Sequence, residues 1–288
     1  MAVITIVCLA AAIPRPAPAI NIAEGKTATN ISFAILYSVL IPVVVYFMWK
    51  NRPSQQTKVD WSLQGPGGYF FGPYMGAALV QSNRWRFWGR EPSYETLPVG
   101  YDFNTSRVNY TPGVVGGLKF GRFFHRLPHF GWQLDGCFTR NDIRNQKVTL
   151  DAPVLGTRYH YIPTQDLYIL NLAAYIMFRY GFWKDKEVTF GRLQPYVGLG
   201  PGLVIIWGDV DSAKNFSLEA LAGVRYMVRK NFSVFIEYKI SQQWDVQLGH
   251  QKTRPQGPTT DPWGERRGQA HFDWTSHKII LGVNFHFL

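Results

Sequence analysis

The stretch NFSLEALAGVRYMVRKNFSVFIEYKI, residues 215–240, decides the fold expected for this chain. Apolar side chains recur there at every second position, on both sides of the short polar break Arg229-Lys230-Asn231. Successive side chains of a strand point to opposite faces, whereas a helix repeats its apolar residues every third or fourth position. The stretch therefore predicts a tight β-hairpin, each strand having one apolar face.

The two faces of this hairpin differ in chemistry. The apolar face consists of Phe216, Leu218, Ala220, Ala222, Val224, Tyr226 and Val228, then Val234, Ile236, Tyr238 and Ile240. The opposite face holds small residues together with Glu219, Arg225, Glu237 and Lys239. Charges of both signs on one face can pair with one another if that face is enclosed.

The same alternation recurs from residue 68 onward. Further strands are predicted at 70–81, 112–124, 130–140, 167–180, 193–207 and 277–288. With the hairpin this makes eight strands, and no segment after residue 50 has helical periodicity. Long loops at 82–110, 141–165 and 242–275 collect at one end, as in an up-and-down antiparallel barrel with short turns at the other end.

Such a barrel can have either of two orientations, and with eight strands its interior has room only for side chains or one small ligand. A lipocalin-like barrel would turn its apolar face inward around a small apolar ligand. A membrane barrel would turn that face toward lipid and enclose Glu219, Arg225, Glu237, Lys239, Asp135, Lys119 and Arg179. Aromatic residues near strand ends favour the membrane form, as in interfacial girdles: Trp132, Trp207, Phe216, Tyr226, Phe285 and Phe287.

The amino-acid composition narrows the class of protein further. The chain has 288 residues and a formal net charge of +11, yet only 17% of its residues are charged, which is sparse for a soluble surface. The positive balance suggests an anionic neighbour, but no run of Lys and Arg with interleaved aromatics predicts nucleic-acid binding. The two cysteines, Cys8 and Cys137, form no disulfide framework and no metal-ligand spacing.

The first 50 residues are interpreted as a signal, targeting or anchor segment, 51–67 as a linker and 68–288 as the barrel. An apolar run at 2–13 ends near Ala17-Pro18-Ala19, which has the form of a signal-peptidase site, but no positive residue precedes it. A second apolar run, 31–49, approaches the ~20 residues that span a bilayer. Lys50 and Arg52 follow it and would hold the remainder in the cytoplasm, so this run is either an uncleaved anchor or a long signal core, or the true start lies further along.

Three stretches carry a family resemblance: PYVGLGPGL (195–203), GVRYMVRKNFSVFIEYK (223–239) and GVNFHF (282–287). They resemble the last strands of small eight-stranded outer-membrane barrels, the group of OmpA-like transmembrane domains and opacity-type surface proteins. The resemblance implies an outer-membrane location in a Gram-negative-type envelope, contact with membrane lipids and lipopolysaccharide, and insertion by the barrel assembly machinery. It also implies a protein with no enzymatic activity, no cofactor and a surface partner reached through loops 82–110, 141–165 and 242–275.

Several groups of residues have both a functional and a plainer structural interpretation. Glu219, Arg225, Glu237 and Lys239 form either a proton or ion relay or, as we expect, a salt-bridge network that holds the barrel shut. Ser276-His277, with Asp273 and Glu265 nearby, suggests a lipid-modifying hydrolase, but adjacent residues of a strand point to opposite faces. The Arg and Trp residues at 84–90 either contact lipopolysaccharide phosphates or form a solvated loop.

No metal site and no phosphate-binding loop are expected. The seven histidines, at positions 125, 129, 160, 250, 271, 277 and 286, lack metal-ligand spacing. Gly198, Gly200 and Gly202 are not followed by the start of a helix, so they fit strand packing better than a phosphate loop. The sequence therefore predicts a non-enzymatic outer-membrane barrel with a structural or surface-interaction role; a lipocalin-like binder and a lipid-modifying hydrolase are the alternatives.

Overall fold

The computed structural model describes residues 68–87, 103–152, 156–162, 164–208, 212–250 and 268–287. The segment predicted at 1–50, the linker 51–67 and Glu265 lie outside these residues. Within them, no helix is long and apolar enough to cross a membrane.

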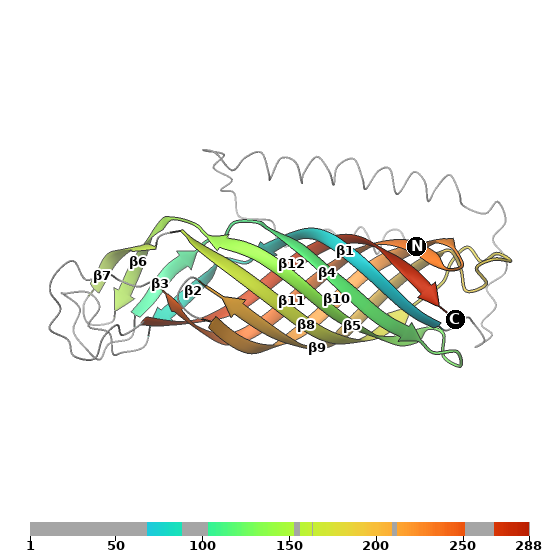
Figure 1. The fold of residues 1–288 in the computed structure, drawn as a ribbon. Helices are drawn as coiled ribbons and strands as arrows, with labels where there is room; N and C mark the ends of the chain where they lie inside the picture. The colour runs from blue at the N-terminus through green and yellow to red at the C-terminus, as the bar shows by residue number, and fades with distance from the viewer. Residues whose placement is uncertain are drawn as a thin grey trace. The chain divides into compact units, whose positions relative to one another are not determined.

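The described chain forms twelve strands, shown in Figure 1. Their bounds are β1 Gly68–Val80, β2 Asn83–Phe87, β3 Phe103–Val108, β4 Gly113–Phe123, β5 Phe130–Ile143, β6 Gln146–Ala152, β7 Gly156–Ile162, β8 Gln165–Arg179, β9 Leu193–Trp207, β10 Ser212–Arg229, β11 Phe232–His250 and β12 Gly268–Phe287.

Eight of these strands close into an antiparallel ring in the order β1-β4-β5-β8-β9-β10-β11-β12. The ring is completed by β1 and β12, which pair from Tyr69 opposite Phe287 to Val80 opposite Ser276. Apart from the small hairpins inserted after β1 and β5, each strand of the ring pairs with the next one along the chain. The predicted fold, an eight-stranded up-and-down antiparallel barrel, is confirmed.

Burial shows which face of the barrel is outside. The outward positions of the ring carry large apolar side chains that remain exposed, among them Met75, Leu118, Leu134, Leu172, Ile176, Val197 and Leu199. All seven charged residues assigned to the interior are buried, none of them more than 6% exposed. This is the pattern of a transmembrane barrel and the reverse of a lipocalin-like one. We call this part of the cylinder the membrane section.

Toward the long-loop end, the pattern inverts. The interior there is an apolar cluster of Trp85, Val108, Tyr110, Ile143, Val148, Ile162, Leu167, Ile169, Val204, Ile206, Ala213, Val246, Leu248, Ala270, Phe272 and Trp274. The outward positions carry exposed polar side chains such as Arg86, Arg107, Lys147 and Gln247. We call the part of the cylinder that surrounds this cluster the outer section.

The loops predicted at 82–110 and 141–165 were wrong. They contain β2 and β3, and β6 and β7, and these hairpins extend the sheet from β12 in the order β2-β3-β6-β7. Much of 242–275 is also strand, because β11 continues to His250 and β12 begins at Gly268. These segments look like loops in the sequence because their outward residues are polar, while single buried residues such as Trp85 supply the apolar face.

Most of the predicted aromatic girdle faces outward. Trp207, Phe216, Phe285 and Phe287 are exposed on the outer surface, and Trp132 is half-buried there. Tyr226 is the exception, at 6% exposed. It lies where the end of β10 is joined by the β8–β9 connection: Tyr226 pairs with Leu193, and the N–H of Met227 donates to the carbonyl of Arg192.

Candidate functional site

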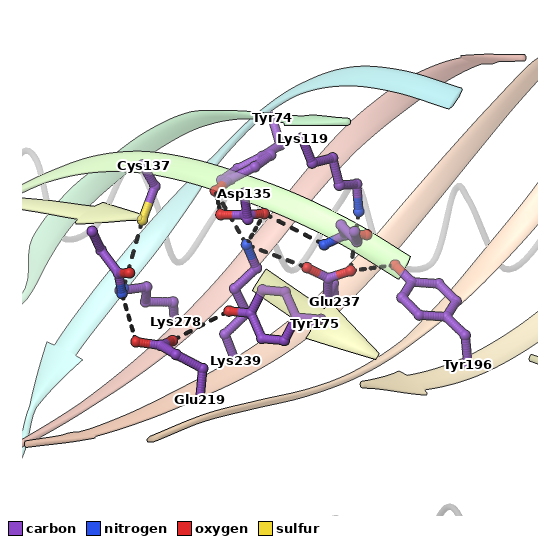
Figure 2. A network of polar contacts seen from close by, with 12 residues as sticks. Tyr74, Lys119, Asp135, Cys137, Tyr175, Tyr196, Glu219, Glu237, Lys239 and Lys278 are labelled. Atoms are coloured by element: carbon purple, nitrogen blue, oxygen red, sulfur yellow. Dashed lines mark hydrogen bonds and ion pairs between the residues drawn. The ribbon is translucent and has the colours of Figure 1, made fainter. Parts of the chain in front are cut away.

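The interior of the membrane section holds a compact group of ion pairs, shown in Figure 2. Lys119 of β4 lies 3.0 Å from a carboxylate oxygen of Glu237 on β11. Lys239, two residues further along β11, lies 2.5 Å from Asp135 on β5 and 3.5 Å from Glu237. Strands from opposite sides of the ring are thus joined through charge pairs that water does not reach.

Two tyrosines complete this group. The hydroxyl of Tyr196 donates to Glu237 at 2.6 Å, and that of Tyr74 donates to Asp135 at 2.5 Å. Their rings fit because the strand positions beside them lack side chains: a Cβ on Gly117 would come within 2.5 Å of the ring of Tyr74. Buried carboxylates are tolerated where such donors satisfy their remaining lone pairs.

Glu219 is held differently, without a cation. It accepts hydrogen bonds from Asn171 at 2.9 Å, Ser217 at 2.7 Å, Tyr175 at 3.2 Å and Ser241 at 2.6 Å. Four neutral donors therefore stabilise this carboxylate. The predicted salt-bridge network does not include it.

Arg225 also stays outside the ion pairs. None of its three guanidinium nitrogens makes a hydrogen bond to any residue that the structure describes, although Arg225 is buried. Its guanidinium lies over aromatic rings instead, 4.6 Å from the ring centre of Phe70, 5.3 Å from that of Tyr196 and 5.4 Å from that of Phe123. Of the four residues proposed for the network, Glu237 and Lys239 are joined, while Arg225 is stabilised by cation–π contact.

These contacts form one buried network across the lumen, which we call the brace. The contacts run without interruption from Tyr196 through Glu237, Lys239 and Asp135 to Tyr74, and every member is buried. Above it, the apolar cluster of the outer section fills the cylinder. A relay would need a polar route to the brace, and the apolar filling obstructs one on the outer side. The lumen geometry thus favours the structural interpretation of these charges.

Tyrosines 74, 175 and 196, with Asn171, Ser217 and Ser241, are the partners that sequence reasoning had not assigned. Asn171, Tyr175, Tyr196 and Ser217 are buried at inward positions of their strands, where the period-two alternation of the sequence also puts them. What the sequence could not supply was which strands face one another across the lumen.

The Ser276–His277 pair of the hydrolase hypothesis fails on geometry. Ser276 points inward and is buried, while His277 lies on the outer face, where its Nδ1 is 2.6 Å from the hydroxyl of Tyr238. Asp273 is also outward, and its carboxylate accepts the N–H of Asp245 at 3.1 Å. The serine and the histidine therefore cannot form the nucleophile and base of one site.

An Asp–His pair on the outer face of the outer section was missed. Asp245 Oδ1 lies 3.0 Å from Nδ1 of His271, and Asp245 has φ +50°, the left-handed region, at an irregularity in the pairing of β11 with β12. The hydrogen bond from His271 is the main cause that lowers the pKa of Asp245, with a smaller contribution from Gln247. The residues are 26 positions apart, and no spacing in the sequence indicates the contact.

The other candidate residues from the sequence do not come together in one site. In the 84–90 cluster, Trp85 belongs to the apolar core, whereas Arg84 and Arg86 lie on the outer face, and Trp88 and Arg90 fall outside the described residues. Gly198, Gly200 and Gly202 lie within β9. Over the ranges that the structure describes, no three His, Cys, Asp or Glu residues are grouped as they would be to hold a metal ion.

Comparison with known proteins gives similarity of fold only. No family model matches the sequence. No curated protein matches it either.

Solved structures that are similar include the outer membrane protein OprG from Pseudomonas aeruginosa, at 14% identity and TM-score 0.48 over 78% of this chain and 98% of that one. Neisserial surface protein A is similar at 14% identity and TM-score 0.40, over 77% and 99%. Ail of Yersinia pestis, in complex with a heparin analogue, is similar at 12% identity and TM-score 0.36, over 76% and 99%.

The assignment to the membrane rests on this chain's own pairing and burial. Its described residues form an eight-stranded ring with an apolar exterior and a charged interior. That is the architecture of the small outer-membrane barrels.

Proposed function

We propose that this protein is a non-enzymatic outer-membrane barrel, closed to ion flow, that acts through the surface it presents beyond the membrane. The observation that carries the proposal is the inverted outer section, where the strands continue past the lipid-facing belt around an apolar core. A cylinder built in this way has a rigid polar exterior facing water. Long loops at that end are also where small outer-membrane barrels face the cell exterior.

Side chains fill the interior of the barrel in both sections, which supports a closed barrel. The brace around Glu237 and Lys239 fills the membrane section, and a cluster with Trp85, Phe272 and Trp274 fills the outer section. Eight strands leave room only for such side chains. We therefore expect that neither water nor ions flow through the barrel.

The edge at which the extended sheet ends, among the strands that the structure describes, supports a role in interaction. Strand β7 is last in the strand order and pairs with β6 alone among the described strands. Its Tyr159 is 69% exposed, and Thr157 is exposed beside it. An uncovered edge offers backbone N–H and C=O groups to an extended segment of another protein, which binds as an added strand.

The two alternative functions have less support. A lipocalin-like ligand site needs an open apolar interior behind a polar wall. The outer section has that polarity, but side chains of the apolar cluster fill its interior. In the membrane section the charged lumen lies behind an apolar wall. The hydrolase needs Ser276 and His277 on one face, and they lie on opposite faces.

Conductance tests the closed barrel. The purified protein, inserted into planar bilayers, is expected to give no stable current steps under an applied voltage. Persistent steps of porin size would contradict the proposal.

Peptide selection tests the interaction surface. Random peptides displayed on phage and selected on the protein in nanodiscs are expected to include binders that slow amide exchange in β7. Tyr159→Lys, which places a charge on the edge, should abolish their binding, because charged residues block strand addition. Gln247→Lys, on the outward face of β11, is the matched control and should not. Selections whose binders ignore Tyr159→Lys would contradict the role of the edge.

A further inference from the structure

The lipid-facing surface is hollowed by an apolar groove of about 790 Å³ that crosses β4, β5, β8 and β9. Its floor is lined by Gly116, Gly136 and Ala174. Its walls include Phe120, Phe138, Leu172, Leu203 and Phe216. The groove therefore lies on the outside of the barrel and presents hydrocarbon to the bilayer.

The groove exists because two outward positions have no side chain. A Cβ on Gly116 would meet no atom within 4 Å, and one on Gly136 would meet only Leu172, at 3.4 Å. Neither glycine has a positive φ, so packing and backbone conformation would both accept a larger residue. Glycine inside a strand weakens it and often marks a bulge, a bend, or a place where a ligand or another backbone approaches closely.

A cation lies beside one wall of the groove. Lys214 of β10 is two residues from Phe216, on the same outward face, and is paired with Ile205 of β9. It is exposed and makes no ion pair or hydrogen bond with the described residues. Arg140, at the same end of β5, is already paired with Asp166 at 2.7 Å. The groove thus has beside it, where the strands approach the outer section, an exposed ammonium that no described residue pairs with.

We propose that the groove holds an acyl chain of lipopolysaccharide, with a phosphate of its lipid A anchor against Lys214. The orientation rests on the proposed function, which places the outer section outside the cell and Lys214 in the outer leaflet. The ligand must have a hydrocarbon part for the groove and an anionic part for the ammonium. A second copy of the chain fits less well, because a two-fold contact at the groove would bring a second Lys214 toward the first.

The test measures lipid retention. Protein purified in detergent is incubated with lipopolysaccharide, with its dephosphorylated form or with phosphatidylglycerol, and bound lipid is quantified by native mass spectrometry. The wild type is expected to retain intact lipopolysaccharide best. Lys214→Glu, which repels phosphate, should lower retention about tenfold, the size expected for loss of a contact to a charged group. Gly136→Leu should lower it as well, because the leucine side chain fills the space that the acyl chain would take.

Matched controls separate the site from general effects. Ala222→Leu adds the same kind of bulk at an outward position of β10 away from the groove lining, and Lys230→Glu reverses a charge at the short turn between β10 and β11. Both are expected to retain lipopolysaccharide like the wild type. Circular dichroism of each variant verifies that the barrel is folded, and a folded Gly136→Phe variant replaces Gly136→Leu if that variant misfolds.

The outcomes divide clearly. Equal retention by wild type, Gly136→Leu and Lys214→Glu would overturn the proposal, as would equal binding of all three lipids. Tyr159→Lys is expected to retain lipopolysaccharide fully, so failure of the free edge as an interaction site would leave this result unchanged. Conversely, a failure to bind lipid would leave unchanged the proposals that the barrel is closed and that its β7 edge binds a partner.

Discussion

The membrane section and the outer section are built from the same strands yet obey opposite rules. Along β8, Leu167 and Ile169 point into the apolar core of the outer section, and two residues later Asn171 points into the polar lumen. On the outward face of the same strand, Asp166 gives way to Leu172 and Ile176. The same strand, β8, passes through both sections. The reversal of polar and apolar faces along it therefore follows the medium outside the barrel, which is water around the outer section and lipid around the membrane section.

The comparison shows how the interior follows from the exterior. Outward residues must match water in one section and hydrocarbon in the other. The inward residues differ accordingly. They are apolar in the outer section, where they form a core, and polar in the membrane section, where partners across the lumen satisfy their hydrogen bonds. Both interiors exclude water, but they lose stability in different ways when a residue is removed, and this gives the tests below.

The apolar interior predicts the largest effect. Trp274 is fully buried in the outer section, so Trp274→Ala should lower the free energy of unfolding by about 3–5 kcal/mol, through lost burial and the cavity left behind. Trp244→Ala, at a residue 55% exposed on the outer face of β11, should change it by less than about 1 kcal/mol. Urea unfolding in detergent, followed by circular dichroism, measures both. Equal losses would mean that the outer section has no core of its own.

In the polar interior, two substitutions of buried charged residues should lower the free energy of unfolding by unequal amounts. Glu237→Gln should cost about 3 kcal/mol, because it leaves Lys119 buried without its carboxylate while Lys239 keeps Asp135. Arg225→Met should cost less than about 1 kcal/mol, since Arg225 has no carboxylate to lose and Met can pack on the same aromatic rings. The same unfolding experiment applies. A larger loss for Arg225→Met than for Glu237→Gln would show that the brace is not what stabilises the lumen.

The two exteriors differ when a charge is added. Leu134→Arg, near the middle of the lipid-facing belt on β5, should destabilise the folded protein in bilayers by about 2–4 kcal/mol. Gln247→Arg, on the outward face of the outer section, should change stability by less than about 0.5 kcal/mol, because it stays in water. Reversible unfolding from lipid vesicles gives both values. A tolerated Leu134→Arg would move the membrane boundary away from this position.

How far the sequence predicted the fold depends on the section. In the membrane section, period-two alternation with apolar outward residues gave the strands closely: 193–207 is β9 to the residue. In the outer section the same period is present, but Arg84, Trp85 and Arg86 show one apolar residue between two charges, which is also the composition of a loop. Alternation alone does not say which solvent lies outside, and short segments with polar outward residues were therefore assigned to loops.

The candidate site was predictable by face and not by partner. Alternation placed Glu219, Glu237 and Lys239 inside correctly, because a strand's inward face is a local property. Which of them pair is set by strands far apart in the sequence: Lys119 and Glu237 are 118 positions apart, and Asp135 and Lys239 are 104 apart. Register around a closed ring decides these contacts, and no local pattern encodes it.

The smallest expected effect compares two carboxylates at opposite ends of the barrel. Burial alone would raise the pKa of Asp185, in the β8–β9 connection, but hydrogen bonds from the N–H groups of Val188 and Glu187 and from Arg192 outweigh it and lower the pKa. A folded-state pKa below the unfolded value of about 3.9 adds stability above that pH, and the gain is lost as pH falls through the folded value. Asp185→Asn should therefore cost up to about 1 kcal/mol near pH 7, and the difference from wild type should vanish in acid.

Asp245 is the matched carboxylate in the outer section. Its pKa is also lowered, first by the hydrogen bond from His271, but its side chain is 61% exposed, so water screens the pair. Asp245→Asn keeps a residue that tolerates the positive φ and should cost less than Asp185→Asn at pH 7. Unfolding free energies of both variants between pH 3 and pH 7 measure the difference. A larger acid-sensitive loss for Asp245→Asn would mean that the outer section depends on its surface pairs rather than on its apolar core, against the division drawn between the two sections.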